Sequence, residues 1–174
     1  MSAGHRNLQP DTKIAPTVTG MMAQRELTIG EVVGGRFRVD RILGMGGMGL
    51  VYQAHDNELD IDVALKLLRP ELASRSDAFE RFRKELLLAR QVSSPHVVRI
   101  HDLVRHEQAW LISMDYVAGS SLERELVEHK VFDPERALQV TRQLALGLAA
   151  AHRSNVVHRD LKPANVLVDE HGDV

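Results

Sequence analysis

The sequence predicts an α+β fold, in which a small antiparallel sheet with one helix is followed by a more helical part. Five β-prone stretches separated by turn residues lie between positions 36 and 117. One stretch with helical periodicity interrupts them, and two more follow residue 118. With 174 residues, 44% of them hydrophobic, the chain is long enough to bury a core.

The five predicted strands have β-branched or aromatic residues and are bounded by glycine, asparagine or aspartate. Their ranges are 36–43, 50–55, 61–68, 97–104 and 109–117. Short turns such as the one at 56–60 join neighbours, which is typical of an antiparallel meander.

The predicted helix of the sheet part has an apolar stripe at spacings of 3, 4 and 3, formed by Phe79, Phe82, Leu86 and Ala89. Glu85 lies beside this stripe, so we expect its carboxylate at the edge of the buried face. Farther on, Ser120 and Glu123 form a capping-box pattern for a short helix to about residue 129.

A longer helix is predicted from Asp133, a side-chain cap followed by Pro134, to about residue 154. Residues 166–168 then read as a short strand before a turn, with the strand that would follow the turn missing. Residues 1–35 are expected to be a flexible leader, and residues 36–174 the folded domain, with a boundary between its two parts near residue 117.

Composition excludes several classes of protein. A net charge of −2 and a pI near 6.5 argue against nucleic-acid binding. The sequence has no cysteine, which excludes disulfides and thiolate chemistry. No apolar run approaches the roughly 20 residues of a membrane span, and no secretory signal is visible, so we expect a cytoplasmic location and no membrane segment in this chain.

A glycine cluster links the first two predicted strands. It fits G-x-G-x-x-G-x-V and runs Gly44, Met45, Gly46, Gly47, Met48, Gly49, Leu50, Val51. Without Cβ atoms, such backbone can lie close over phosphates and offer them N–H groups. A dinucleotide-binding turn would need a helix after the glycines, but a β-prone run follows. A glycine-rich hairpin without a ligand is the other alternative.

Lys66 is a single cation in an apolar predicted strand. Burying an ammonium is costly unless an anion pairs with it, and Glu85 is the expected partner. Such a pair would hold the lysine toward nucleotide phosphates. A lysine that reaches the surface is the alternative.

The segment 158–165, His-Arg-Asp-Leu-Lys-Pro-Ala-Asn, follows the long predicted helix. It brings together a carboxylate, an ammonium and a carboxamide. Phosphoryl transfer uses this set to orient the attacking hydroxyl, to neutralise the moving phosphoryl group and to hold Mg²⁺.

Four motifs occur in order along the chain, namely the glycine cluster, Lys66, Glu85 and the segment 158–165. Together they resemble the eukaryotic-type protein kinase family. The Lys-Pro pair at 162–163 resembles its serine/threonine branch, and the Gly-Gly-Met-Gly wording resembles bacterial members. The resemblance covers about residues 36–174 and implies a complete small lobe at 36–117 and part of a large lobe at 118–174.

The resemblance implies catalytic roles at five positions. Asp160 would be the catalytic base, Lys162 would neutralise the γ-phosphate, and Asn165 would be the protein ligand of Mg²⁺. Lys66 and Glu85 would form an ion pair. His158 would be structural, and Arg159 would read a phosphorylated activation loop.

The same resemblance implies an ATP site with the glycine cluster over its phosphates. The apolar side chains that would sandwich adenine are Leu43, Val51, Ala64 and Leu167. Met114 would lie at the back of the pocket, and the backbone of Asp115 and Val117 would bind the adenine edge.

The sequence stops at Val174 before any Asp-Phe-Gly motif, which would supply the other metal ligand. We therefore expect a C-terminally truncated kinase that is inactive or nearly so. A non-catalytic nucleotide-binding or interaction module of the same fold, with kinase–kinase association, is the alternative, and a small-molecule kinase is a third. His96, His101 and His106 are spaced by five, which puts successive strand side chains on opposite faces and disfavours a shared metal.

Overall fold

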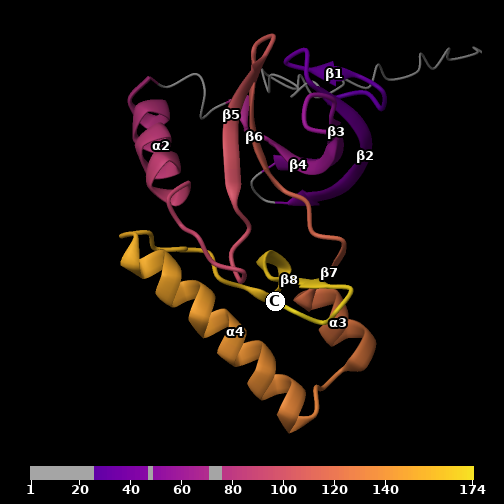
Figure 1. The fold of residues 1–174 in the computed structure, drawn as a ribbon, viewed down its shortest axis with the longest axis vertical. Helices are drawn as coiled ribbons and strands as arrows, with labels where there is room; N and C mark the ends of the chain where they lie inside the picture. The colour runs from indigo at the N-terminus through magenta and orange to yellow at the C-terminus, as the bar shows by residue number, and fades with distance from the viewer. Residues whose placement is uncertain (1–25, 47–48, 71–75) are drawn as a thin grey trace, which may run out of the picture.

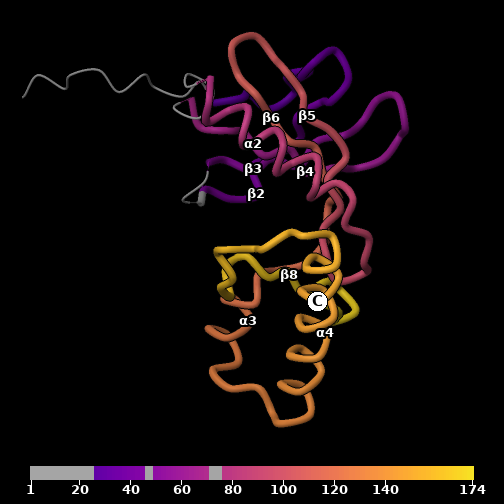
Figure 2. Tube along the Cα trace, turned by 90° about the vertical axis from the view of Figure 1, so that its left-hand side faces the viewer, coloured from indigo at the N-terminus to yellow at the C-terminus, as the bar shows by residue number. Residues whose placement is uncertain are grey.

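The computed structural model describes residues 26–46, 49–70 and 76–174. They form two lobes, a curled antiparallel sheet with one flanking helix and a second lobe dominated by two helices (Figure 1). The connections between the lobes run along one side of the molecule (Figure 2). The predicted α+β fold is confirmed.

The sheet has six antiparallel strands in the order β1-β2-β3-β4-β6-β5. Their bounds are β1 Val32–Val33, β2 Phe37–Gly46, β3 Gly49–Asp56, β4 Ile61–Leu67, β5 Ile100–His106 and β6 Ala109–Asp115. The five expected strands are present, each shifted by no more than three residues at either end. The added strand, β1, covers one edge of the sheet.

The small-lobe core lies on one face of this sheet, and strict alternation explains it. In β4, Val63, Leu65 and Leu67 are fully buried in the core, whereas Lys66 faces the other way. Helix α2 (Ser76–Ala89) packs through Leu86 against the β4–β6 region. The functional side of β4 is therefore the side opposite its most buried residues.

The predicted boundary of the leader at residue 35 is wrong. Leu27 and Val33 are buried in the small-lobe core, and the Leu27 N–H donates to the Tyr52 hydroxyl at 3.1 Å. Val33 pairs with Phe37 in the β1–β2 ladder. A strand of two residues is too short to show a period, which is why the sequence did not reveal it. Residues 1–25 of the expected leader lie outside the described residues.

The second lobe contains β7 Gly119–Ser121, α3 Leu122–His129, α4 Pro134–Arg153, the 3₁₀ turn η1 Pro163–Asn165 and β8 Leu167–Asp169. As predicted, the Asp133 carboxylate caps α4, accepting from the N–H groups of Glu135 and Arg136 at 3.0 Å. The cap of α3 is Ser121, which accepts from Arg124, so the predicted cap at Ser120 is one residue early.

Strands β7 and β8 pair with each other, so the predicted strand at 166–168 has its partner earlier in the chain, which the sequence did not indicate. Gly119 faces Asp169, and a Cβ at Gly119 would lie 2.0 Å from the Val168 carbonyl oxygen. Beneath the ribbon, an apolar cluster of Leu122, Val140, Val166 and Val168 fixes it to α3 and α4. The segment 158–165 is thus held between α4 and β8.

Candidate active site

A cavity of about 540 Å³ lies between the two lobes. Six of the predicted site residues line it, namely Lys66, Met114, Asp115, Val117, Asn165 and Leu167. They come from β4, from the end of β6 and its continuation, and from the η1–β8 segment. Residues separated by about 100 positions in the sequence therefore meet at one site.

The glycine cluster forms the tip of the β2–β3 hairpin. Gly46 pairs with Gly49 and Gly44 pairs with Val51. Gly49 has a φ of +123°, and a Cβ there would lie 2.3 Å from the Leu67 carbonyl oxygen, so this position requires glycine. A strand follows the glycines, which excludes the dinucleotide-binding turn. Gly47 and Met48 lie outside the described residues.

Strand register places the remaining predicted adenine contacts beside this cavity. Val51 on β3 pairs with Lys66 on β4, and Ala64 on β4 pairs with Met114 on β6. Met114 and Lys66 line the cavity, whereas Val51, Ala64 and Leu43 are not among its lining residues. Leu43 lies on β2, just before the glycine tip, and is partly exposed.

Lys66 is influenced by a charged residue of the other lobe. Burial disfavours its charged form and lowers the pKa of the ammonium, while the carboxylate of Asp160 acts in the opposite direction. Asp160 belongs to the other lobe, about 95 positions away in the sequence. The predicted cation and the predicted carboxylate thus act on each other across the same site.

The loop that bears Asp160 is shaped by its backbone. Helix α4 ends at Ser154, and Arg159 then adopts a left-handed conformation with a φ of +61°. The Asp160 N–H donates to the His158 carbonyl at 2.8 Å, which closes a tight turn. A non-glycine residue at positive φ is uncommon, and this conformation persists only where the surrounding structure holds it in place.

Asp160 lies in a compact polar cluster. Its Oδ2 accepts from Lys162 Nζ at 3.0 Å and from Asn165 Nδ2 at 2.9 Å. The Lys162 bond, followed by the Asn165 bond, lowers the pKa of this carboxyl group. Asp160 is therefore ionised near neutral pH and suited to accept a hydrogen bond from a hydroxyl, although a low pKa makes it a weak base.

The donor set fits a Mg²⁺ ion only in company with phosphate oxygens. The Asn165 amide nitrogen donates to both the carbonyl and the carboxylate of Asp160, and its amide oxygen takes part in neither bond. Mg²⁺ is commonly held by one or two side chains together with substrate phosphates and water. Within the described ranges, no group of three or more histidine or acidic residues is placed to bind a metal by itself.

Glu85 occupies a different position from the one expected. Its side chain is 64% exposed, and its Oε1 accepts from Arg159 Nη1 at 3.3 Å. The structure thus pairs Glu85 with Arg159 rather than with Lys66. The position beside the apolar stripe of α2 was compatible with either partner, because helical periodicity does not fix how the lobes are placed.

We call residues 115–117, which include the last residue of β6, the hinge. The side chains that hold the hinge in place were not predicted from the sequence. The Asp115 carboxylate accepts from the Arg99 N–H at 3.1 Å and contacts His101 Nε2 at 2.7 Å. The Tyr116 hydroxyl accepts from Arg41 Nη2 at 2.8 Å. No motif or spacing signals these contacts, since each joins two distant stretches.

The three histidines with a spacing of five have three separate partners. His101 contacts Asp115, while His96 Nδ1 lies 2.7 Å from the Val174 carbonyl oxygen. His106 Nε2 lies 2.8 Å from Glu31 Oε1, and its Nδ1 accepts from the Gly34 N–H. Each is accounted for by local structure.

Comparison with known proteins shows which family this chain is similar to. The protein kinase domain model matches residues 37–174. The serine/threonine-protein kinase PrkC of Bacillus subtilis is 36% identical over 148 residues, covering 85% of this chain, and PknD of Mycobacterium tuberculosis is 38% identical over 134 residues, covering 77%. The crystal structure of the PknI kinase domain of Mycobacterium tuberculosis superposes with a TM-score of 0.75 at 30% identity, covering 83% of this chain and 59% of that one.

A curled sheet lobe and a helical lobe, with a cavity between them that Lys66 and Asn165 line, have the arrangement of a protein kinase fold. The chain belongs to the protein kinase family, and its curated relatives are bacterial serine/threonine kinases. It spans 23% of the length of PrkC and 20% of PknD. Among the residues that the structure describes, no helix has the length and apolarity needed to cross a bilayer.

Proposed function

We propose that this domain binds Mg-ATP and serves the transfer of its γ-phosphoryl group to a serine or threonine hydroxyl of a protein. The observation that carries this proposal is that one interlobe cavity is lined by both Lys66 and Asn165, and that Asn165 is hydrogen-bonded to Asp160. A half-buried lysine that a carboxylate of another lobe influences is typical of functional sites.

In this proposal the cavity receives the nucleotide. The adenine ring lies between Leu43, Val51 and Ala64 on one side and Leu167 on the other, with Met114 at the back. The backbone of Asp115 and Val117 binds its edge. The glycine-rich tip of the hairpin, with Gly44, Met45, Gly46, Gly47, Met48 and Gly49, covers the phosphates, and Asn165 offers its amide oxygen to Mg²⁺.

Asp160 orients the substrate hydroxyl, whose oxygen attacks the γ-phosphorus while the bond to the β–γ bridging oxygen breaks. Because the transition state is loose, proton transfer to Asp160 is late and a weak base suffices. Lys162, 3.0 Å from Asp160, is placed to neutralise charge on the moving group.

Calorimetric titration with Mg-ATP tests the binding step. We expect Lys66→Met to weaken binding by tenfold or more, since about 1.4 kcal/mol of phosphate attraction is a factor of ten. Lys84→Met is the matched control, because Lys84 is an exposed lysine on α2. Equal affinity of the Lys66→Met variant and the wild type would refute the assignment.

Nucleotide binding without transfer is the second candidate function, for a module that could also associate with another kinase. It would be the outcome if residues 1–174 bound Mg-ATP but transferred no phosphoryl group. We propose that this polypeptide alone is inactive or nearly so. Phosphorylation of a protein substrate by residues 1–174 that disappears in Asp160→Asn would contradict that expectation. We further propose a cytoplasmic location, where ATP is available.

A further inference from the structure

Arg41 forms a contact between β2, the strand above the proposed nucleotide site, and the hinge. It lies on β2, two positions before Leu43, and its Nη2 donates to the Tyr116 hydroxyl at 2.8 Å. Tyr116 lies between Asp115 and Val117, both of which line the cavity. One side chain thus joins the strand above the expected adenine position to the segment beside it.

The strand is locally distorted around Arg41. The β2–β3 ladder has register shifts between Val39 and Arg41 and again between Ile42 and Gly44. Bulges of this kind redirect side chains and are common beside functional sites. The short segment 41–42 is therefore set apart from the regular ladder on both sides.

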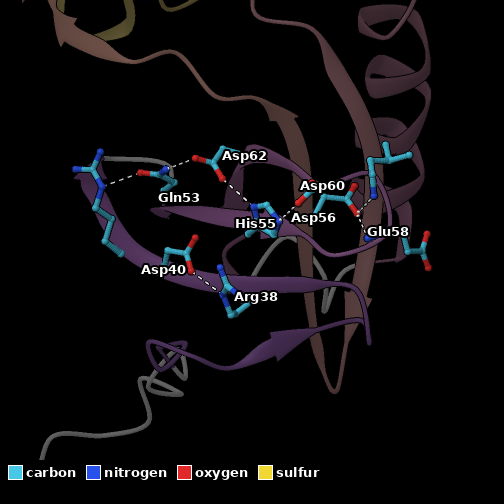
Figure 3. Close-up of polar contacts among 10 residues, drawn as sticks. Arg38, Asp40, Gln53, His55, Asp56, Glu58, Asp60 and Asp62 are labelled. Atoms are coloured by element: carbon cyan, nitrogen blue, oxygen red, sulfur yellow. Dashed lines mark hydrogen bonds and ion pairs between the residues drawn. The ribbon is translucent and has the colours of Figure 1, made fainter.

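A second contact holds the Arg41 guanidinium in place. Arg41 Nε donates to Gln53 Oε1 at 2.7 Å, and Gln53 is its cross-strand neighbour. Gln53 Nε2 donates in turn to Asp62 Oδ2 at 2.8 Å, which fixes the orientation of the amide. Figure 3 shows Gln53 and Asp62 directed toward one another, with His55 continuing the chain from Asp62 toward Asp60.

The hinge is held from the opposite side as well. The Asp115 carboxylate is bound by the Arg99 N–H and lies within hydrogen-bond distance of His101, both in or next to β5. Asp115 is thereby fixed to the rigid part of the sheet, and Tyr116 is fixed to the strand that carries the glycine tip. The Arg41 contact thus joins β2 directly to the hinge.

We propose that Arg41 is a positioning residue for nucleotide binding. Through its hydrogen bond to Tyr116, it holds β2, the strand above the proposed adenine position, at a fixed distance from the hinge. This inference rests on the proposed function. The contact is charge-assisted but exposed, so its expected effect on affinity is about two- to fivefold.

The test is a double-mutant cycle with a fluorescent ATP analogue and Mg²⁺. We expect Arg41→Ala and Tyr116→Phe each to weaken binding about two- to fivefold, and the double variant to be no weaker than the weaker single variant. Arg38→Ala is the matched control. Arg38 lies on the same strand but pairs with Asp40 at 2.9 Å, away from the hinge, and its loss should leave affinity unchanged (Figure 3).

Several results would overturn the inference. Additive effects of the two substitutions, or equal effects of Arg41→Ala and Arg38→Ala, would show that the contact does not position the nucleotide. A lower melting temperature of nucleotide-free Arg41→Ala with unchanged affinity would assign Arg41 a purely structural role. Failure of the wild type to bind the analogue would refute the proposed function and this inference together, whereas binding that needs Lys66 but not Arg41 would refute this inference alone.

Discussion

Lys66 carries its ammonium into a site where burial lowers its pKa, and the cost of that burial falls on the nucleotide-free protein. The carboxylate of Asp160 offsets part of this cost. A bound triphosphate would supply more negative charge at the same place. At the scale of single residues, stability and binding therefore make opposite demands on this position.

We expect Lys66→Met to stabilise the nucleotide-free protein by about 1 kcal/mol, because an apolar side chain of similar length replaces a poorly solvated charge. Urea unfolding without nucleotide measures this change. The same variant should lose the rise in melting temperature that Mg-ATP gives the wild type. A less stable Lys66→Met protein would show that the contacts of Lys66 in the empty site are worth more than its burial costs.

The exposed cluster around His55 predicts a pH dependence of stability. His55 Nδ1 lies 3.0 Å from Asp62 and its Nε2 lies 3.1 Å from Asp60, a geometry that only the imidazolium satisfies at both nitrogens. The contact with Asp62 raises the pKa of His55 and lowers the pKa of Asp62. Charged His55 therefore stabilises the fold fully below the unfolded pKa of about 6.5, and the effect is lost as pH rises through the higher folded pKa.

At the acid end, the contribution of Asp62 is present above its unfolded pKa of about 3.9 and is lost as pH falls through the lower folded value. The wild type should thus exceed His55→Gln in stability between about pH 4 and 6.5, with the difference shrinking in more alkaline solution. Urea midpoints at pH 5.5 and 8.5 measure this. A difference that does not vary with pH would contradict an ionic origin.

At the scale of elements, the β2–β3 hairpin contains the glycine cluster, and α4 leads into the segment 158–165. The two elements are stabilised by different kinds of residue. The hairpin contains two kinds of glycine, one that the backbone conformation requires and one with open space around it. Gly49 is required by its backbone angle and by the close approach of the Leu67 carbonyl. A Cβ at Gly44 would meet nothing within 4 Å.

This difference separates a glycine that the fold requires from one that it does not require. Gly49→Ala should destabilise the protein by about 3 kcal/mol, because it adds a clash to a strained backbone angle. Gly44→Ala should change stability by no more than about 0.5 kcal/mol. Thermal unfolding of the two variants is the measurement. Equal losses would mean that both positions are constrained by the fold itself.

Elements with a local cause were predictable from the sequence. Asp133 and Pro134 predicted the start of α4, because capping depends on neighbours in the chain. The pairing of β7 with β8 was not predictable, because it joins positions 119 and 169 and each strand has only three residues. Similarly, β1 gave no periodic signal and was placed in the leader.

At the scale of the molecule, the lobes meet where the loop before β5 packs on α4. A Cβ at Gly147, in the middle of α4, would lie 2.5 Å from the His96 carbonyl oxygen. Val92 is buried against Ala150 and Ala151 in the same region. The backbone of the loop therefore lies directly on the helix, and the distance between the lobes depends on a residue without a side chain.

Gly147→Ala tests this contact. Alanine favours the helix by about 1 kcal/mol, but the added methyl group must push the loop away, at a cost of about 1–3 kcal/mol. We expect a net loss of about 1 kcal/mol in urea unfolding and weaker nucleotide binding. The control is Leu138→Ala, at an exposed position of α4. A more stable Gly147→Ala variant would mean that the loop yields freely.

The parts of the site that follow strand order were predicted, and those that depend on the placement of the lobes were not. Lys66 and Asp160 belong to different lobes, so the effect of one on the other was expected only from the family resemblance, and Asp160 is not among the residues that line the cavity. The partner of Glu85 was mistaken, since an exposed carboxylate on a helix can reach either Lys66 or Arg159. The contact of Arg41 with Tyr116 joins residues 75 positions apart and leaves no local pattern.

The β7–β8 ribbon would keep the protein together after a cut between α3 and α4. Residues 119 and 169 are paired, and the cluster of Leu122, Val140, Val166 and Val168 lies beneath them. Between α3 and α4, Lys130 has a φ of +62° and Val131 is 81% exposed, which marks a protease-accessible corner. A trypsin cut after Lys130 would sever the polypeptide and leave two fragments clasped together by the ribbon and the apolar seam.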